Sequence, residues 1–216
     1  MEIIDSYKTI KSPAIGEYKE KGSKFIAYAR EINSENEFKN YLEIIKKEHF
    51  KARHHCYAYA IGPSNELYRY NDDGEPGGTA GLPIFNQIKS YNLSNIGIIV
   101  VRYFGGTKLG VPGLIRAYKT STKDALENAK IITRLIEDKI RIDYEYIFMG
   151  DIMRIVNNFG VKVLENTFDT LPGIILKVRK SKTNEFVKTI YSAILNRDIK
   201  DIKEDEKVEG LKIKIC

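Results

Sequence analysis

The sequence lacks tryptophan and contains only two cysteines and three histidines. Cys56 and Cys216 are too few and too far apart in the chain for a disulfide scaffold or a zinc cluster, which indicates a reducing compartment. Residues 1–13 have no apolar segment typical of a signal peptide, and no apolar run elsewhere approaches membrane-spanning length. We therefore expect a cytoplasmic protein of bacterial type that has no contact with membranes.

The standard phosphate-binding motifs are absent as well. Val111 and Pro112 follow Gly110, whereas a Walker loop ends in Gly-Lys-Ser or Gly-Lys-Thr, and no Gly-x-Gly-x-x-Gly pattern fits the chain. The composition, with 43% hydrophobic and 30% charged residues, is that of a globular protein, and 216 residues suffice for one large or two modest domains. A net charge of +6 and a pI near 9.1 favour polyanionic partners.

The most informative stretch runs from residue 96 to residue 118. Ile98–Val101 is apolar and rich in β-branched residues, which predicts a buried strand. Pro112 is expected to be the first residue of a helix, since apolar residues recur at helical spacing after it. The loop between them contains Gly105, Gly106, Gly110 and Gly113. The stretch therefore predicts a strand, a glycine loop and a helix in succession.

A helix start of this kind attracts anions because its first N–H groups are unpaired and its dipole is positive there. Arg102, Lys108 and Arg116 add positive charge around it, so a phosphate is the expected ligand. In the alternative interpretation, the glycines only permit a tight turn and close packing. The predicted phosphate-binding or nucleic-acid-binding residues are Arg102, Gly105, Gly106, Thr107, Lys108, Gly110, Gly113 and Arg116.

The same residues carry a resemblance to a known family. Residues 102–110 and 113–118 resemble the signature of the IMPACT (imprinted ancient, YigZ-type) family. Residues 21–26, 54–59 and 72–81 resemble three further motifs of that family, in the same order along the chain. Two positions differ from the family pattern: Gly77 replaces a usual serine, and Pro112 replaces a usual glycine.

The resemblance implies an α+β protein with an N-terminal domain similar to the second domain of ribosomal protein S-five and a C-terminal ferredoxin-like βαββαβ sandwich. Domains four and five of elongation factor G resemble the same pair. Those relatives handle ribosomal RNA, so RNA or the translation machinery is the implied partner, by analogy of fold. Eukaryotic members restrain activation of an initiation-factor kinase with the help of an extra N-terminal domain. We do not extend that role to this chain.

The pattern along the first 132 residues is consistent with this fold. Residues 18–30 predict a pair of strands broken at Gly22, and Ser34 with Glu37 forms a capping box for a helix that ends near His49. Residues 55–61 and 67–70 predict a hairpin, and a short helix is expected over residues 83–88. We assign residues 1–132 to an IMPACT-type N-terminal domain of mixed strands and helices.

Residues 133–216 are assigned to the second domain. Strands are expected around residues 136–142, 161–168, 173–178 and 208–215, and helices over residues 149–159 and 186–194. This order is βαββαβ, and we expect the segment to fold independently. A turn is predicted at Leu171–Pro172–Gly173, and residues 197–207 are interpreted as a solvated loop. Nothing in this domain indicates catalysis.

Five residues are candidates for catalysis: His54, His55, Asp72, Asp73 and Glu75. His54 and His55 are neighbours on a predicted strand, so their side chains point to opposite faces; with no third ligand nearby, we predict no metal site and no cofactor. The three carboxylates could hold Mg²⁺ or act as acid and base. We favour a structural role, in which a carboxylate caps a helix or pairs with Arg102 or Lys108.

Tyrosines interleave with arginines on the predicted sheet. Tyr57, Tyr59, Tyr68, Tyr70 and Tyr103 alternate with Arg53, Arg69 and Arg102. Such a surface is typical of single-stranded nucleic acid binding, but alternating tyrosines are equally typical of ordinary sheet packing.

Two classes of function remain. The favoured class is a non-enzymatic nucleic-acid-binding or translation-associated regulatory protein that uses the basic strand–loop–helix face. The alternative is a small enzyme that acts on a phosphorylated or nucleotide substrate with a carboxylate or magnesium site. An enzyme needs a concave site with convergent polar groups, and a binder needs an open basic surface. The sequence shows no complete nucleophile–base set, and it does not specify the oligomeric state.

Overall fold

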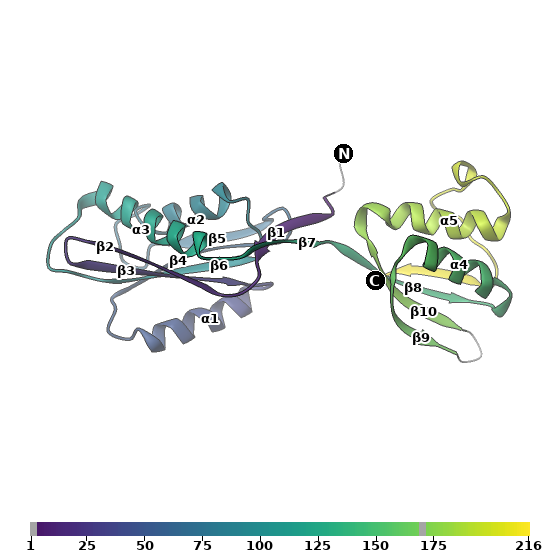
Figure 1. Cartoon of the computed structure of the whole chain (residues 1–216), viewed down its shortest axis with the longest axis horizontal. Coiled ribbons are helices and arrows are strands. Elements are labelled where there is room, and N and C mark those ends of the chain that lie inside the picture. The colour runs from purple at the N-terminus through teal and green to yellow at the C-terminus, as the bar shows by residue number, and fades with distance from the viewer. Residues whose placement is uncertain (1–3, 169–171) are drawn as a thin grey trace. The chain divides into compact units, whose positions relative to one another are not determined.

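The computed structural model describes residues 4–168 and 172–216 and divides the chain into two compact units. One unit comprises residues 6–134, and the other comprises residues 135–216 together with Ile4 and Asp5. Both are mixed α/β units built on antiparallel sheets (Figure 1). Within the described ranges, no helix is long and apolar enough to cross a membrane.

The N-terminal unit is built around a five-stranded antiparallel sheet of order β2-β3-β6-β4-β5. The strands are β2 (Ala14–Glu20), β3 (Ser23–Glu31), β4 (His54–Ile61), β5 (Leu67–Asn71) and β6 (Ile96–Tyr103). Helices α2 (Gly81–Ser90) and α3 (Gly110–Glu127) cover one face, and α1 (Glu35–Glu48) covers the other (Figure 1). A separate pair is formed by β1 (Ser6–Ile10) and β7 (Ile131–Leu135).

The central strand β6 is apolar along nearly its whole length because helices cover both faces of the sheet. Ile98 and Val100 belong to the core beneath α2 and α3, whereas Ile99 and Val101 belong to the core beneath α1. A Cβ at Gly97 would lie 2.6 Å from the Phe38 ring, so the glycine lets α1 approach the sheet closely.

Helix α1 begins at the predicted capping box. The Ser34 Oγ accepts a hydrogen bond from the N–H of Glu37 (3.2 Å), and the Glu37 carboxylate accepts one from the N–H of Asn33 (2.9 Å). Its buried stripe of Phe38, Tyr41 and Ile45 packs on the sheet. The capping interaction and the apolar stripe thus confirm the helix predicted from the sequence.

Three boundaries differ from those predicted. Helix α3 begins at Gly110, so Pro112 is its third residue rather than its first; this position also tolerates proline, because the early N–H groups of a helix have no intrahelical acceptor. Helix α2 begins two residues before Pro83. The pair β1–β7 was not predicted, because its strands are short and more than a hundred residues apart, and β7 is largely exposed.

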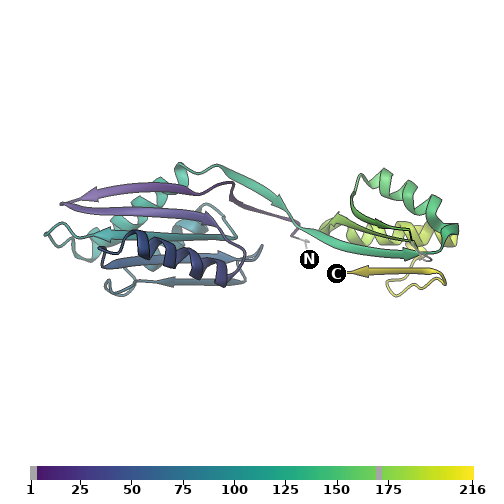
Figure 2. The same ribbon diagram turned by 90° about the horizontal axis from the view of Figure 1, so that it is seen from below.

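The C-terminal unit has the predicted βαββαβ order. It contains β8 (Glu137–Tyr144), α4 (Met149–Phe159), β9 (Lys162–Thr167), β10 (Gly173–Arg179), α5 (Thr183–Leu195) and β11 (Leu211–Ile215), with three short 3₁₀ turns, η1 (Tyr146–Phe148), η2 (Lys180–Lys182) and η3 (Ile199–Asp201). The strand order is β11-β8-β10-β9, and every pairing is antiparallel. Helices α4 and α5 lie on the same face of the sheet (Figure 2).

Two further predictions concern this unit. Helix α4 ends at Phe159, the predicted last residue, and Gly160 after it adopts the left-handed conformation (φ 60°). The segment 197–207 is not wholly a solvated loop, because it contains η3 and the buried Ile202. The predicted turn at Leu171–Pro172–Gly173 lies partly outside the described residues.

Candidate functional site

A pocket of about 710 Å³ opens at the start of α3 in the N-terminal unit, and we call it the α3 pocket. Four segments of the chain form its walls. Lys51, Arg53 and His54 come from the start of β4 and the loop before it, and Glu75 and Pro76 come from the loop before α2. The other walls are the end of β6 with the residue that follows (Arg102, Tyr103 and Phe104) and the start of α3 (residues 108–111 and 114). Antiparallel pairing of β4 with β6 places His54 opposite Arg102, which brings these distant segments together.

The start of α3 forms part of the wall of this pocket. Gly110 and Val111 line it, and no side chain of the described residues caps the helix. Gly110 has a positive φ of 70°, a conformation that favours glycine. An uncapped helix start beside open space is a favourable position for an anion. The predicted role of this loop in phosphate binding stays a prediction.

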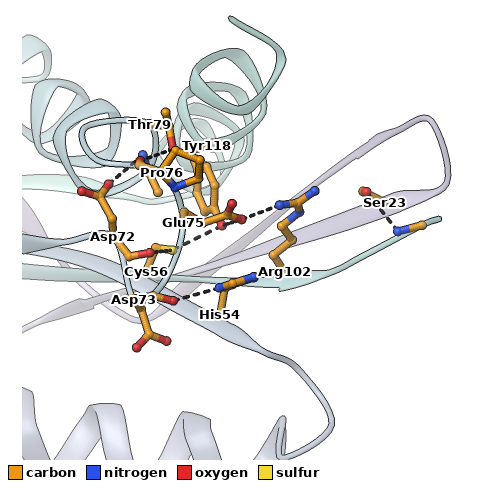
Figure 3. Close-up of polar contacts among 12 residues, drawn as sticks. Ser23, His54, Cys56, Asp72, Asp73, Glu75, Pro76, Thr79, Arg102 and Tyr118 are labelled. Carbon is orange, nitrogen blue, oxygen red and sulfur yellow. Dashed lines mark hydrogen bonds and ion pairs between the residues drawn. The ribbon is translucent and has the colours of Figure 1, made fainter. Parts of the chain in front are cut away.

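Two of the predicted loop glycines have packing partners within the protein. The Gly105 N–H donates to the Ser23 Oγ (3.1 Å; Figure 3), and a Cβ at Gly105 would lie 1.9 Å from the Gly22 carbonyl carbon. A Cβ at Gly113 would lie 2.9 Å from that of Leu109. These two glycines therefore permit close packing of the chain on itself, whereas Gly106 and Thr107 are exposed.

The charges around the pocket differ from those predicted. Arg116 pairs with Glu20, and Arg102 is buried in an ion pair with Glu75, so neither is a free cation. Lys108 is exposed, and within the part of the chain that the structure describes it forms no ion pair. Lys51 and Arg53 also line the pocket, are exposed, and form no ion pair with any described residue.

Beneath the pocket lies a buried polar cluster. The Arg102 Nη1 donates to the Glu75 Oε1 (2.6 Å), and the Tyr118 hydroxyl donates to the same oxygen (2.8 Å; Figure 3). The Cys56 Sγ lies 3.2 Å from the Tyr118 hydroxyl oxygen. Burial raises the pKa of both the Cys56 thiol and the Tyr118 hydroxyl, so both groups stay protonated at neutral pH. The cluster therefore supports the floor of the pocket and does not offer a thiolate nucleophile.

Arg102 also contacts aromatic rings. Its guanidinium carbon lies 5.4 Å from the centre of the Phe25 ring and 5.5 Å from that of Phe104. The Arg102 Nε is buried and has no hydrogen-bond partner among the residues described. Phe104 is 56% exposed at the rim, so one face of an aromatic side chain is available beside the cations.

The carboxylates have separate structural partners. Asp72 Oδ1 accepts hydrogen bonds from the N–H groups of Ala80 (2.9 Å) and Gly81 (2.8 Å), at the start of α2. Asp73 Oδ2 accepts one from the His55 N–H (2.7 Å). Glu75 pairs with Arg102 as described above. The structure does not bring the three carboxylates together, and no group of three metal-binding side chains occurs in the described ranges.

The two histidines point to opposite faces of the sheet, as predicted. His54 lines the α3 pocket, and its Nδ1 lies 2.8 Å from the Asp73 carbonyl oxygen (Figure 3). Because a carbonyl only accepts, Nδ1 carries a proton, so Nε2 is the ring nitrogen that can carry a lone pair. His55 is buried toward the α1 side, its Nε2 has no partner among the described residues, and burial lowers its pKa against the opposing effect of Asp73.

The tyrosines do not form one stacking surface. Tyr57 and Tyr59 stack on each other beneath α1, and Tyr59 is buried. Tyr68 and Tyr70 stack on Phe85 of α2, on the other side of the sheet. The Tyr103 hydroxyl lies 2.8 Å from the His49 Nδ1. The arrangement corresponds to the packing alternative, with Phe104 as the exposed ring at the α3 pocket.

The fold and the site define a class: an α/β protein of two units, whose N-terminal unit has a basic pocket at the start of a glycine-rich helix. The family model of the Impact N-terminal domain matches residues 21–126. The chain is 32% identical over 204 residues to the IMPACT family member YvyE of Bacillus subtilis (strain 168), and the match covers 94% of this chain and 93% of that protein. The chain therefore belongs to the IMPACT family, which confirms the resemblance carried by its motifs.

Other relatives agree with this assignment. The IMPACT family member YigZ of Escherichia coli (strain K12) is 29% identical over 168 residues, covering 77% of this chain and 82% of the relative. A crystal structure of a hypothetical protein has a TM-score of 0.68 at 24% identity, covering 99% of this chain and 98% of the other. That likeness shows the two-unit fold.

Proposed function

We propose that this protein is a non-enzymatic, translation-associated regulatory protein that binds the phosphate groups of RNA in the α3 pocket. Membership of the IMPACT family supports a role in translation. We further infer that residues 1–132 form a domain similar to the second domain of ribosomal protein S-five and that residues 133–216 form a ferredoxin-like domain in a cytoplasmic protein. The βαββαβ element order and the strand order β11-β8-β10-β9 support the second assignment.

One observation carries the proposal: uncompensated cations converge on an uncapped helix start. Lys51, Arg53 and Lys108 line the same pocket and form no ion pair with a described residue. A phosphate there would accept hydrogen bonds from backbone N–H groups and from charged side chains, which are the stronger kind. Phe104, exposed at the rim, would supply a stacking face for a base next to that phosphate.

The test is a titration of the full chain with a short single-stranded RNA at several salt concentrations. Each phosphate contact contributes about 0.7 to the slope of log affinity against log salt for a single strand. Lys108→Ala should lower that slope by about one contact, whereas Lys119→Ala, which removes a charge from an exposed position of α3 outside the pocket, should leave it unchanged. A chelator should have no effect.

Two results would overturn the proposal. The first is an absence of RNA binding at low salt by the folded protein. The second is an equal effect of the two lysine substitutions, because general electrostatic attraction would then explain the binding without a pocket.

A second candidate function is supported by the geometry of His54. The α3 pocket is concave, and the hydrogen bond of the His54 Nδ1 to the Asp73 carbonyl leaves Nε2 as the ring nitrogen that can carry a lone pair, beside three cations. In its neutral form this ring could act as a general base on a phosphorylated or nucleotide substrate. In that case a panel of nucleotides should show turnover that His54→Gln abolishes while phosphate binding persists. If no nucleotide of the panel is turned over, RNA binding remains as the one supported function.

A further inference from the structure

The C-terminal sheet has one face that its helices do not cover. Ile140, Ile142 and Leu176 point into the core under α4 and α5, and the residues that alternate with them point to the other side. Seven of these outward residues are basic and exposed, and one of them, Arg179, pairs with Asp5. We call the other six the cationic sheet face: Lys139, Arg141, Lys162, Lys177, Lys212 and Lys214. They come from all four strands of this sheet.

The strand register places these charges directly beside one another. Lys177 on β10 is opposite Lys139 on β8 and opposite Lys162 on β9, so three lysines form a row across three neighbouring strands. Lys214 on β11 is opposite Arg141 on β8. Neighbouring strands lie about 4.8 Å apart, and like charges directly opposite each other are destabilising. The fold itself therefore gains nothing from this arrangement.

Acidic neighbours compensate the face only in part. Arg141 pairs with Asp143 at 2.9 Å, and Lys177 lies 3.6 Å from Glu137. Glu165, opposite Ile175, is a further carboxylate on this side. Lys139, Lys162, Lys212 and Lys214 form no ion pair within residues 4–168 and 172–216. The face keeps an excess of positive charge that a regularly spaced polyanion would neutralise.

We propose that the cationic sheet face is a second RNA-contact surface, separate from the α3 pocket, that binds the phosphate backbone without regard to sequence. That the polyanion is RNA rests on the function proposed above. The strands carry no aromatic side chain on this face in the described ranges, so bases cannot stack there. Its central apolar residue, Ile175, is half-buried.

The test is a salt titration of the full chain with a 20-nucleotide single-stranded RNA and with a duplex. The variant Lys139→Gln/Lys162→Gln/Lys177→Gln removes the lysine row. If all three lysines contact phosphates, the salt slope should fall by about 2 on the single strand and by nearly 3 on the duplex. The matched control, Lys200→Gln/Lys203→Gln/Lys207→Gln, removes three exposed charges from the same unit away from the sheet and should keep the wild-type slope.

Folding and the other proposal are checked separately. Removing like charges from neighbouring strands should leave the thermal unfolding temperature unchanged or raise it at low salt. Inorganic phosphate, followed through the backbone N–H signals of Gly110 and Val111, reports on the α3 pocket. Two results of the RNA titration would contradict a contact at the lysine row: a wild-type salt slope for the lysine-row variant, or an equal loss of slope for the control variant. A third contradicting result is that the lysine-row variant binds RNA normally but has lost binding to vesicles of acidic phospholipid or to an acidic protein. The present proposal can fail in these ways while Lys108→Ala still weakens RNA binding, which would leave the proposed function standing.

Discussion

Replacing Glu75 by glutamine would remove the negative charge that compensates the buried Arg102. Both side chains of this ion pair are more than nine-tenths buried, and their contact is 2.6 Å. Glutamine keeps the shape and an acceptor for the Tyr118 hydroxyl, so the change acts mainly on charge. Breaking a buried ion pair by removing one partner costs about 3–5 kcal/mol, because the remaining charge is left in a poorly solvated position.

Cys56 provides a local probe for this effect. Its side chain is fully buried and lies 3.2 Å from the Tyr118 hydroxyl, so a thiol reagent can reach it only when this region opens. If closing is faster than labelling, the rate follows the opening equilibrium. In a Cys216→Ser background, Glu75→Gln should raise the Cys56 labelling rate between about 100-fold and about 4,000-fold, which is the same free energy converted at 1.4 kcal/mol per tenfold.

Two companion variants make the prediction specific. The double variant Glu75→Gln/Arg102→Met removes both charges and fills the space with an apolar chain, so it should recover most of the lost protection. Glu20→Gln breaks the exposed pair with Arg116 and should change the rate only slightly. A rise of less than tenfold for Glu75→Gln, or no recovery in the double variant, would refute the assignment of this pair as a desolvated support of the pocket.

Three further predictions concern stability and reactivity. Burial holds the pKa of His55 below its ordinary value of 6.5, so the unfolded state binds more protons than the folded state. The free energy of unfolding, measured in urea, should therefore fall as the pH drops from 7 to 5, and His55→Gln should reduce that fall. Under native conditions a thiol reagent should react rapidly with the exposed Cys216 and should react with Cys56 only when the protein unfolds. Rapid reaction of both thiols would contradict the burial of Cys56. Ser34→Ala removes the cap of α1 and should lower the free energy of unfolding by about 1 kcal/mol in urea, whereas no change would mean that the capping bond contributes nothing.

Much of the fold could be predicted because local patterns and burial agree. The capping box at Ser34, the apolar run of β6 and the alternating apolar residues of β8 each specify an element by short-range rules. The pair β1–β7 could not be predicted in this way, because its two strands are distant in the chain and β7 buries none of its side chains fully.

The composition of the site depends on pairings that a sequence does not display. Arg102 has the pattern of a free cation until the fold places Glu75 against it, 27 positions away in the chain. Lys51 and Arg53 reach the α3 pocket because β4 begins where its antiparallel neighbour β6 ends. The lysine row of the C-terminal sheet likewise requires the register of three strands, although the alternation of charge along β8 is visible in the sequence.

Binding of a phosphate at the start of α3 can be observed through backbone amide chemical shifts. Inorganic phosphate, added to the isotope-labelled full chain, should shift the N–H signals of Gly110 and Val111 in a saturable way. Lys108→Ala should weaken that response, and Lys119→Ala should not. Unchanged signals at Gly110 and Val111, at phosphate concentrations that shift signals elsewhere in the chain, would contradict phosphate binding at this helix start.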